Sequence, residues 1–367
     1  MVRKLIACML AVLLCMSFSA CGYRELHQRV LIQAVGVDKS SQGYTVTVRA
    51  ASSQEESGDE LYTCQGASVL EALSSLSLTT GREPFYAHNA LVVFGSTCGE
   101  AGIDDIMDLF IRYHDTRPGV QVYLAEENAA EILSVKQDNQ LISTGELQRL
   151  SSSGEYNGKS VSVDFLGFVN SGERPGSSPV MPVLGIRQDR VEVLGTAYFQ
   201  DYRWAGTLTL EETRGFLAIK GELASGELVV EGQDFGMVTL SISRGKTTTQ
   251  LSFAANGSPS FRTTCTITAD ISTLSGGVEP DEEFYRQVED AAVAQLSAEM
   301  SAALDKALME DGCDIFGFGN RISQKYPKRW ASLNWDAVMS RCEYQLQVDV
   351  TVLRMEQGGL SAGGTSQ

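Results

Sequence analysis

The first hundred residues that follow the apolar N-terminus switch between two hydrophobic periods. Val46, Val48 and Ala50 alternate with polar residues, which predicts a strand with one buried face. A helical repeat follows Gly66, and the unbroken apolar run 91–94 predicts a strand that is covered on both faces. Further apolar repeats predict a helix at 103–110, a strand at 120–124 and a helix at 129–135. The order is roughly β-β-β-α-β-α-β-α, which predicts a sheet packed by helices.

The middle of the chain is more polar. Residues 136–178 are rich in Ser and Gly, and within them the stretch 161–169 is compatible with either a short helix or a strand. Beyond this region the pattern predicts a helix at 211–219 that ends at Gly221, preceded by three strands at 180–186, 191–199 and 204–208. We interpret residues 139–224 as a second, smaller domain.

The last third of the chain combines strands with one long helix. Alternation predicts strands at 228–231, 237–243, 248–254 and 262–271. Apolar residues from Phe284 to Leu308 then keep the 3.6-residue period, and the acidic residues 281–283 suit the start of a helix. Alternation from Tyr344 to Val352 predicts a final strand. We therefore expect an α+β protein with mixed sheet/helix domains at 21–138, 139–224 and 225–356, after a signal peptide at 1–20 and before a disordered tail at 357–367.

The N-terminus has the pattern of a bacterial lipoprotein signal. Two cations precede an apolar run at 5–16, which is shorter than the ~20 residues that span a bilayer. Two small residues stand directly before Cys21, and Phe18 occupies the lipobox position where Leu is usual. We predict cleavage before Cys21 and lipidation of its sulfur. The alternatives are an ordinary secretory signal cut elsewhere and an uncleaved anchor.

Composition limits the partners. The formal net charge is −17, so the chain is repelled by nucleic acid and by anionic lipid surfaces. We therefore expect no nucleic-acid partner, and membrane attachment through the N-terminal lipid. Beyond the signal, no segment approaches ~20 consecutive apolar residues.

The remaining cysteines form no CxxC pair and are odd in number. We interpret most of them as buried packing residues, with a single disulfide as the alternative, and they are Cys64, Cys98, Cys265, Cys313 and Cys342.

A search for catalytic groups yields no candidate. The chain has no cysteine with an adjacent histidine base and no histidine at metal-ligand spacing, the three histidines being His27, His88 and His114. We interpret His88 as structural, and Asp104, Asp105 and Asp108 as solvated residues at a helix start. The sequence thus predicts no catalytic residue, no metal site and no cofactor.

Two short segments have competing interpretations. GFGNRI at 317–322 lacks the third Gly of a dinucleotide fingerprint and follows a helix, so we reject that reading. KYPKRW at 325–330 combines three cations with two aromatic residues and would suit lipid headgroups or an acidic partner. We favour a solvated connecting loop in which Trp330 is buried.

The stretch DIFGFGNRISQKYPKRWASLNW at 314–335 closely resembles the hallmark of the Ger(x)C family, the lipoprotein subunit of spore germinant receptors. Segments 24–39 and 69–95 resemble the N-terminal part of the same family, so the resemblance covers nearly the whole body. Gly22 and Tyr23 depart from it, because the family commonly has Trp-Asp after the lipid cysteine. The hallmark residues are Asp314, Ile315, Gly317, Phe318, Gly319, Pro327, Lys328, Trp330 and Trp335.

The resemblance implies an elongated, three-domain α+β protein without enzymatic activity. It implies a lipid-anchored C subunit on the outer face of the cytoplasmic (spore inner) membrane, acting with polytopic A-type and B-type receptor subunits in spore germination. It assigns no ligand pocket, so small-molecule binding is unproven. Gly317 and Gly319 would permit unusual backbone geometry, and Trp330 and Trp335 would fill the junction between helix and strand. The alternative function is a solute-binding lipoprotein of a membrane transporter.

Overall fold

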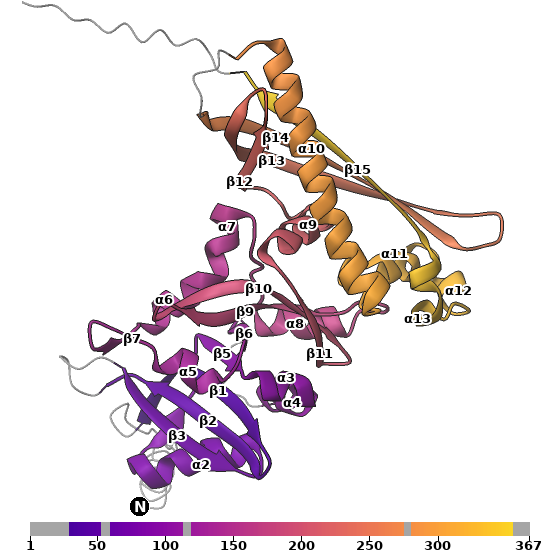
Figure 1. Cartoon of the computed structure of the whole chain (residues 1–367). Helices are drawn as coiled ribbons and strands as arrows, with labels where there is room; N and C mark the ends of the chain where they lie inside the picture. The colour runs from indigo at the N-terminus through magenta and orange to yellow at the C-terminus, as the bar shows by residue number, and fades with distance from the viewer. Residues whose placement is uncertain (1–28, 53–58, 113–118, 275–279, 355–367) are drawn as a thin grey trace, which may run out of the picture.

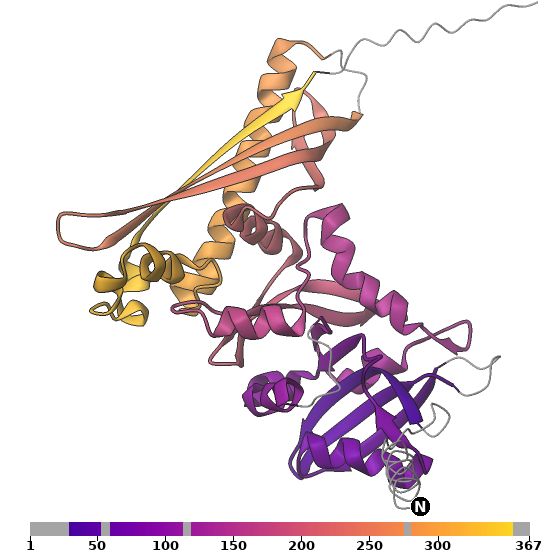
Figure 2. The same cartoon turned by 180° about the vertical axis from the view of Figure 1, so that it is seen from behind.

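The computed structural model describes residues 29–52, 59–112, 119–274 and 280–354. They form an elongated molecule in which a larger body built on residues 29–208 adjoins a C-terminal body (Figures 1 and 2). No helix in the described ranges is long and apolar enough to cross a membrane. The predicted signal peptide, Cys21, His27, His114 and the predicted tail at 357–367 lie outside these ranges.

The larger body contains one nine-stranded mixed sheet, in the order β11-β10-β9-β6-β5-β1-β2-β3, with β4 paired to β1. The pairs β1–β5, β5–β6 and β6–β9 are parallel, and β1–β4 is parallel as well. The strands are β1 (Arg29–Ser40), β2 (Gly43–Ala50), β3 (Glu60–Gly66), β4 (Glu83–Phe85), β5 (Leu91–Phe94), β6 (Gln121–Ala125), β9 (Val180–Arg187), β10 (Arg190–Gln200) and β11 (Arg203–Leu208). A separate small hairpin joins β7 (Lys136–Gln137) to β8 (Gln140–Leu141).

Helices cover both faces of this sheet, and each face has its own apolar core. One core includes residues of α2 (Val69–Thr80), α3 (Ser96–Ala101), α4 (Asp104–Arg112) and α8 (Phe165–Gly172). The other core includes residues of α5 (Ala129–Ser134) and α6 (Thr144–Arg149). A short 3₁₀ turn (Leu150–Ser153) and α7 (Gly154–Asn157) then lead away from α6. In the ambiguous stretch 161–169, residues 161–164 are extended and residues 165–169 begin α8, with Asp164 as the N-cap.

The sheet runs across the boundary predicted at residue 138. Strand β9, from the predicted middle domain, pairs with β6 through Leu124–Val183 and Ala125–Leu184. The three strands of residues 180–208 thus extend the N-terminal sheet instead of forming a sheet of their own. The α+β class is confirmed, whereas the division into three domains stays a prediction.

The C-terminal body packs one long helix on a four-stranded sheet, in the order β12-β13-β14-β15 (Figure 1). Strand β15 runs parallel to β14, and the other two pairs are antiparallel. The elements are α9 (Leu210–Lys220), β12 (Gly226–Gly232), β13 (Gly236–Phe253), β14 (Pro259–Leu274), α10 (Glu282–Leu304), the π-helical turn η3 (Asp305–Glu310), α11 (Phe318–Lys325), α12 (Pro327–Trp330), α13 (Trp335–Val338), the 3₁₀ turn η4 (Met339–Arg341) and β15 (Glu343–Leu353).

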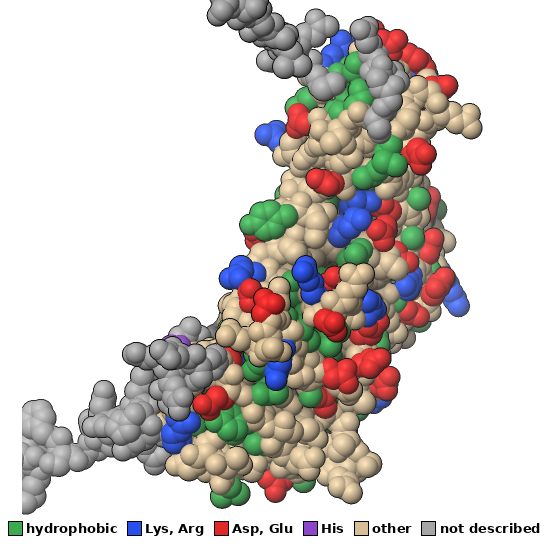
Figure 3. Space-filling view, turned by 60° about the vertical axis from the view of Figure 1, so that its left-hand side comes forward, with side chains coloured by type: hydrophobic (Ala, Val, Ile, Leu, Met, Phe, Trp, Pro, Cys, Tyr) green, Lys and Arg blue, Asp and Glu red, His purple; other side chains and the backbone are tan. Residues whose placement is uncertain are grey.

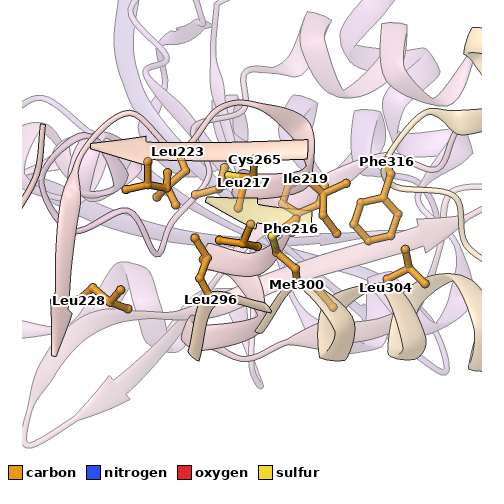
Figure 4. Close-up of a cluster of buried hydrophobic side chains, with 14 of the residues drawn as sticks. Phe216, Leu217, Ile219, Leu223, Leu228, Cys265, Leu296, Met300, Leu304 and Phe316 are labelled. Carbon is orange, nitrogen blue, oxygen red and sulfur yellow. The ribbon is translucent and has the colours of Figure 1, made fainter. Parts of the chain in front are cut away.

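The predicted long helix is confirmed, and it begins at an Asp281 N-cap whose side chain accepts from the Phe284 N–H. Its apolar face contacts α9 within the core of the C-terminal body, where Leu296 and Met300 lie beside Phe216 (Figure 4). The prediction of two separate strands at 237–243 and 248–254 is wrong in one respect, because these residues form the single strand β13. Its register against β14 shifts near Arg244, and the ladder continues past that irregularity.

Candidate functional site

The signature segment 314–335 begins with a turn built on Asp314. Its carboxylate accepts hydrogen bonds from the backbone N–H groups of Gly317 (2.8 Å), Phe318 (3.1 Å) and Gly319 (2.7 Å). These are N–H groups that the first turn of α11 leaves without helical partners. Burial of the carboxyl group nevertheless outweighs these bonds and raises its pKa from 3.8 to about 6. Asp314 therefore fixes the start of α11 through its hydrogen bonds, although burial disfavours the charged form of its carboxyl group.

The two signature glycines are required for different reasons. Gly317 has a φ of +74°, in the left-handed region that glycine adopts without a steric penalty. Gly319 has no positive φ, but a Cβ at this position would lie 2.7 Å from Trp335 Nε1 and 2.8 Å from the Gly176 carbonyl oxygen. Only Gly317 thus has the special backbone geometry that we expected of both, whereas Gly319 provides space for a close approach.

The signature tryptophans belong to an aromatic cluster that joins α11–α13 to the sheet. Trp335 is buried, and its ring centroid lies 6.4 Å from that of Trp330 and 6.2 Å from that of Phe261. Phe261 of β14 also stacks on Tyr344 of β15, with an interplanar angle of 6°. Trp330 is half-buried, less than we expected. Pro327 is the first residue of α12, where the absent N–H of proline costs little.

The signature segment also holds the loop that leads into β9. The backbone N–H of Ser178 donates to the Asp314 carbonyl oxygen at 2.9 Å. Gly176 has a φ of +61°, and a Cβ there would lie 2.6 Å from the Trp330 ring and 2.8 Å from the Trp335 ring. Gly176 is not among the residues predicted from the sequence. Its only sequence signal is a place in the Gly- and Ser-rich stretch 170–179, which also contains Gly172.

The cationic stretch 325–330 connects α11 to α12 at the surface and includes the residues of α12. The Arg329 guanidinium lies 4.0 Å from the ring centroid of Phe253, near the tip of the β13–β14 hairpin. Tyr326 meets the same ring edge-on at 5.1 Å. Lys325, Lys328 and Arg329 are exposed. Acidic side chains are likewise interspersed with Lys and Arg over the face shown in Figure 3, so neither sign forms one continuous patch there.

The cysteines act as packing residues, as predicted. All five within the described ranges are free and buried. Burial raises the pKa of Cys98 and of Cys313 to about 12 and that of Cys342 to about 11, so their thiols stay protonated at neutral pH.

The remaining candidates for chemistry do not come together. His88 is exposed, with its ring centroid 6.1 Å from that of Phe85. Asp104 and Asp105 are exposed in the first turn of α4. The glycine-rich stretch 317–322 follows a turn instead of a strand, contrary to what a dinucleotide site needs. Across the described ranges, no group of three His, Cys, Asp or Glu residues is placed to hold a metal ion.

The structure reveals polar contacts of α9 and β10 with α10 and the turn η3 that the sequence did not predict. Arg214 of α9 pairs with Glu299 of α10, and Lys306 pairs with Glu212 at 3.0 Å. The hydroxyl of Tyr198, on β10, donates to the carboxylate of Asp311. These bonds connect α9 and strand β10 of the nine-stranded sheet to α10 and to the turn η3 that follows it. A charged residue on a predicted helix gives no indication that its partner lies about 85 residues away.

A groove of about 720 Å³ lies where the two bodies meet. Its walls come from α8, from the extended segment 160–164 and from the end of α9. The charged lining residues include both signs, namely Glu155, Asp164, Arg174, Lys220 and Glu222. The groove therefore lacks the single dominant charge that would select an anion or a cation.

Comparison with known proteins agrees with the resemblance. Residues 22–186 match the family model described as spore germination protein N-terminal domain, and residues 194–356 match the one described as spore germination B3/GerAC like, C-terminal. Spore germination protein KC of Bacillus subtilis (strain 168) is 22% identical, with 92% of each chain covered. Spore germination protein B3 of the same organism is 21% identical over 94% of this chain and 96% of its own.

The fold also has a solved counterpart. The crystal structure of the GerBC protein matches with a TM-score of 0.58 at 16% identity, covering 87% of this chain and 97% of its own. At that identity the likeness concerns the fold alone. The two matching domains define a protein of the spore germination class. The chain belongs to the Ger(x)C family, the C-subunit-like proteins of germinant receptors.

Proposed function

We propose that this chain is the lipid-anchored C subunit of a nutrient germinant receptor. It acts without catalysis, beside polytopic A-type and B-type subunits, on the outer face of the cytoplasmic (spore inner) membrane. The observation that carries the proposal is the match of both family domains, which together leave only residues 187–193 and the chain ends unmatched. The lipoprotein signal before Cys21 supports the location.

The arrangement of the described residues supports a role in assembly. The signature residues are used internally: Asp314 caps a helix, and Gly319 makes room for Trp335. Buried, protonated cysteines provide no nucleophile. An elongated body with a mixed-charge surface can contact more than one partner along its length. These features fit a subunit that positions others.

Co-purification tests the partners. A C-terminally tagged chain, extracted in mild detergent from spore inner membranes, should retain two multi-spanning proteins, and deletion of its gene should abolish germination triggered by their nutrient. Cys21→Ala should reduce both assembly and germination. Recovery of the chain from spores without any polytopic protein, together with normal germination of a deletion strain that has no paralogue, would contradict the proposal.

Lipidation is tested separately. Mass spectrometry of the mature N-terminus should find diacylglyceryl on Cys21, and Cys21→Ala should abolish incorporation of labelled palmitate. Cys15→Ala is the matched control, because Cys15 leaves with the predicted signal peptide and its loss should not reduce labelling. An unmodified Cys21 in mature protein would disprove the anchor.

The groove between the two bodies gives the alternative function, a solute-binding lipoprotein, a specific test. Its volume of about 720 Å³ falls within the ~300–1,000 Å³ range of small-molecule pockets. If the protein is a solute-binding lipoprotein, calorimetric titration with amino acids or sugars should show tight binding, and Lys220→Ala should weaken that binding. Absence of binding heat with wild-type protein would leave the receptor subunit as the better assignment.

A further inference from the structure

The outer face of α2 is exposed and almost uncharged. Glu71 is the single charged residue among the twelve residues of this helix, in a chain of which 20% is charged. Leu78 is 87% exposed and Leu70 is 44% exposed, and the serines at positions 74 and 77 lie between them. Exposed leucines within an uncharged surface indicate contact with an apolar surface rather than with bulk water.

The same face adjoins two hollows that share lining residues. One hollow, of about 440 Å³, is lined by Leu70 and Leu73 of α2 and by Leu109 of α4. The other, of about 820 Å³, includes Leu70 and Leu109 again, together with Ile106. Leu70 therefore belongs to both hollows, where apolar residues of α2 and α4 lie beside charged residues, whereas Leu78 lines neither of them. The charged lining residues are Arg82 and Glu83 in the first hollow and Lys39 and Asp105 in the second.

The chain enters the fold beside this surface. Arg29, the first described residue, pairs with Glu83 in the parallel β1–β4 ladder, and its guanidinium lies 4.7 Å from the Phe85 ring centroid. Glu83 comes only two residues after Gly81, the C-cap of α2. Position 29 thus lies next to the end of α2 that carries Leu78, and this helix lies at the outer end of the molecule (Figures 1 and 2).

The length of the tether limits how far this end can lie from a membrane. Seven residues, 22–28, lie between Cys21 and Arg29, and the eight Cα–Cα steps that they make span at most ~29 Å even when fully extended. A lipid on Cys21 would therefore hold the α2 end close to the bilayer and leave the C-terminal sheet at the far end.

We propose that the outer face of α2 lies on the lipid surface, with Leu70 and Leu78 inserted among the headgroups. This inference rests on the proposed anchoring at Cys21. Contact through leucines and hydroxyls suits an acidic protein, because α2 brings only one carboxylate, that of Glu71, towards anionic lipid. The lower end of the molecule in Figure 3 is mostly tan and green, with few charged side chains in view.

A direct test places a dye on this face. Full-length lipidated protein carrying Leu78→Cys, labelled with a polarity-sensitive dye, is reconstituted in vesicles of phosphatidylcholine and phosphatidylglycerol with brominated acyl chains. The native cysteines of the described ranges are buried and do not compete for the label. The matched control is Val229→Cys on β12, which is 46% exposed at the opposite end of the molecule.

The emission maximum of the dye at position 78 should shift to the blue, and the bromines should quench its fluorescence. The dye at position 229 should show neither change. An unshifted dye at 78 on protein that floats with the vesicles overturns the membrane face and leaves the anchor intact. A shift at 78 that requires co-reconstituted polytopic subunits also overturns it, because the face then contacts protein. Protein that does not float at all shows that the anchor itself is wrong. Because Leu78 is so exposed, its replacement should not disturb folding, which intrinsic tryptophan fluorescence checks.

Discussion

Arg214 and Glu299 form a two-pronged ion pair between α9 and α10. Arg214 Nε lies 2.7 Å from Glu299 Oε2, the Nη2 group donates to Oε1, and the two side chains are only 2% and 9% exposed. Arg214 Nη1 also donates to the carbonyl oxygen of Glu227, in β12, at 2.8 Å. One guanidinium group thus joins two helices and the edge of the C-terminal sheet.

Removing one partner of this pair should be costly. Arg214→Met leaves the Glu299 carboxylate buried without its cation, which typically lowers the free energy of unfolding by ~3–5 kcal/mol. Adding Glu299→Leu should recover a large part of the loss. The matched control is Arg286→Met, because its partner Glu283 is exposed and the loss of this solvated pair should change the free energy of unfolding far less. Urea denaturation of the purified mature chain measures all four proteins, and equal losses for Arg214→Met and Arg286→Met would refute the argument.

The two signature glycines should respond differently to alanine. Gly319→Ala places a methyl group 2.7 Å from Trp335 Nε1 and 2.8 Å from a backbone oxygen, so overpacking should cost ~1–3 kcal/mol and alter tryptophan emission. Gly317→Ala has open space but a left-handed backbone, so it should cost only ~1–2 kcal/mol and leave the emission spectrum unchanged. Fluorescence-monitored unfolding reports both effects. An altered native spectrum for Gly317→Ala alone would reverse the assignment.

Asp314 should make stability fall as pH rises. Its pKa is raised to about 6 in the folded chain from 3.8, so between these values the folded state binds more protons than the unfolded state. Its contribution is fully present well below pH 3.8 and is lost as the pH rises through about 6, a change of about 3 kcal/mol. Asp314→Asn cannot ionise. Between about pH 3.8 and pH 6, the free energy of unfolding of the wild type should therefore fall relative to that of the variant. Parallel pH profiles for the two proteins would show that the carboxyl group does not titrate there.

The buried cysteines should resist alkylation. Cys98 and Cys313 have pKa values of about 12, and none of the five described cysteines is exposed. Iodoacetamide at about pH 8 should modify none of the five in the folded chain and all of them in urea. Mass spectrometry after digestion counts the modified sites. Modification of one cysteine in the folded state would identify a region that opens locally.

Periodic patterns predicted most individual elements. Alternation located β2 and β15, and the 3.6-residue repeat located α10, because each of these elements buries one face against a core. Alternation divided β13 in two, because the polar residues around Arg244 look like a turn, whereas the structure keeps them paired across a register shift.

Long-range pairings were beyond the reach of the sequence. The contact between β6 and β9 that carries the sheet past residue 138 rests on two residue pairs, which leave no periodic signal. The signature turn shows the same limit. The spacing from Asp314 to Gly319 was recognisable, but the partner Gly176 lies in a distant loop whose glycines are indistinguishable by sequence.

The uninterrupted sheet from β3 to β11 has a mechanical consequence. A continuous hydrogen-bonded sheet resists bending between its two edge strands. At its last strands, Tyr198 and Leu208 belong to the same apolar core as residues of α9 and α10. A tilt imposed at the α2 end would therefore reach the C-terminal sheet as a rotation of the whole molecule instead of being absorbed at a hinge. The protein would work as a lever, converting small angular changes at one end into larger displacements at the other.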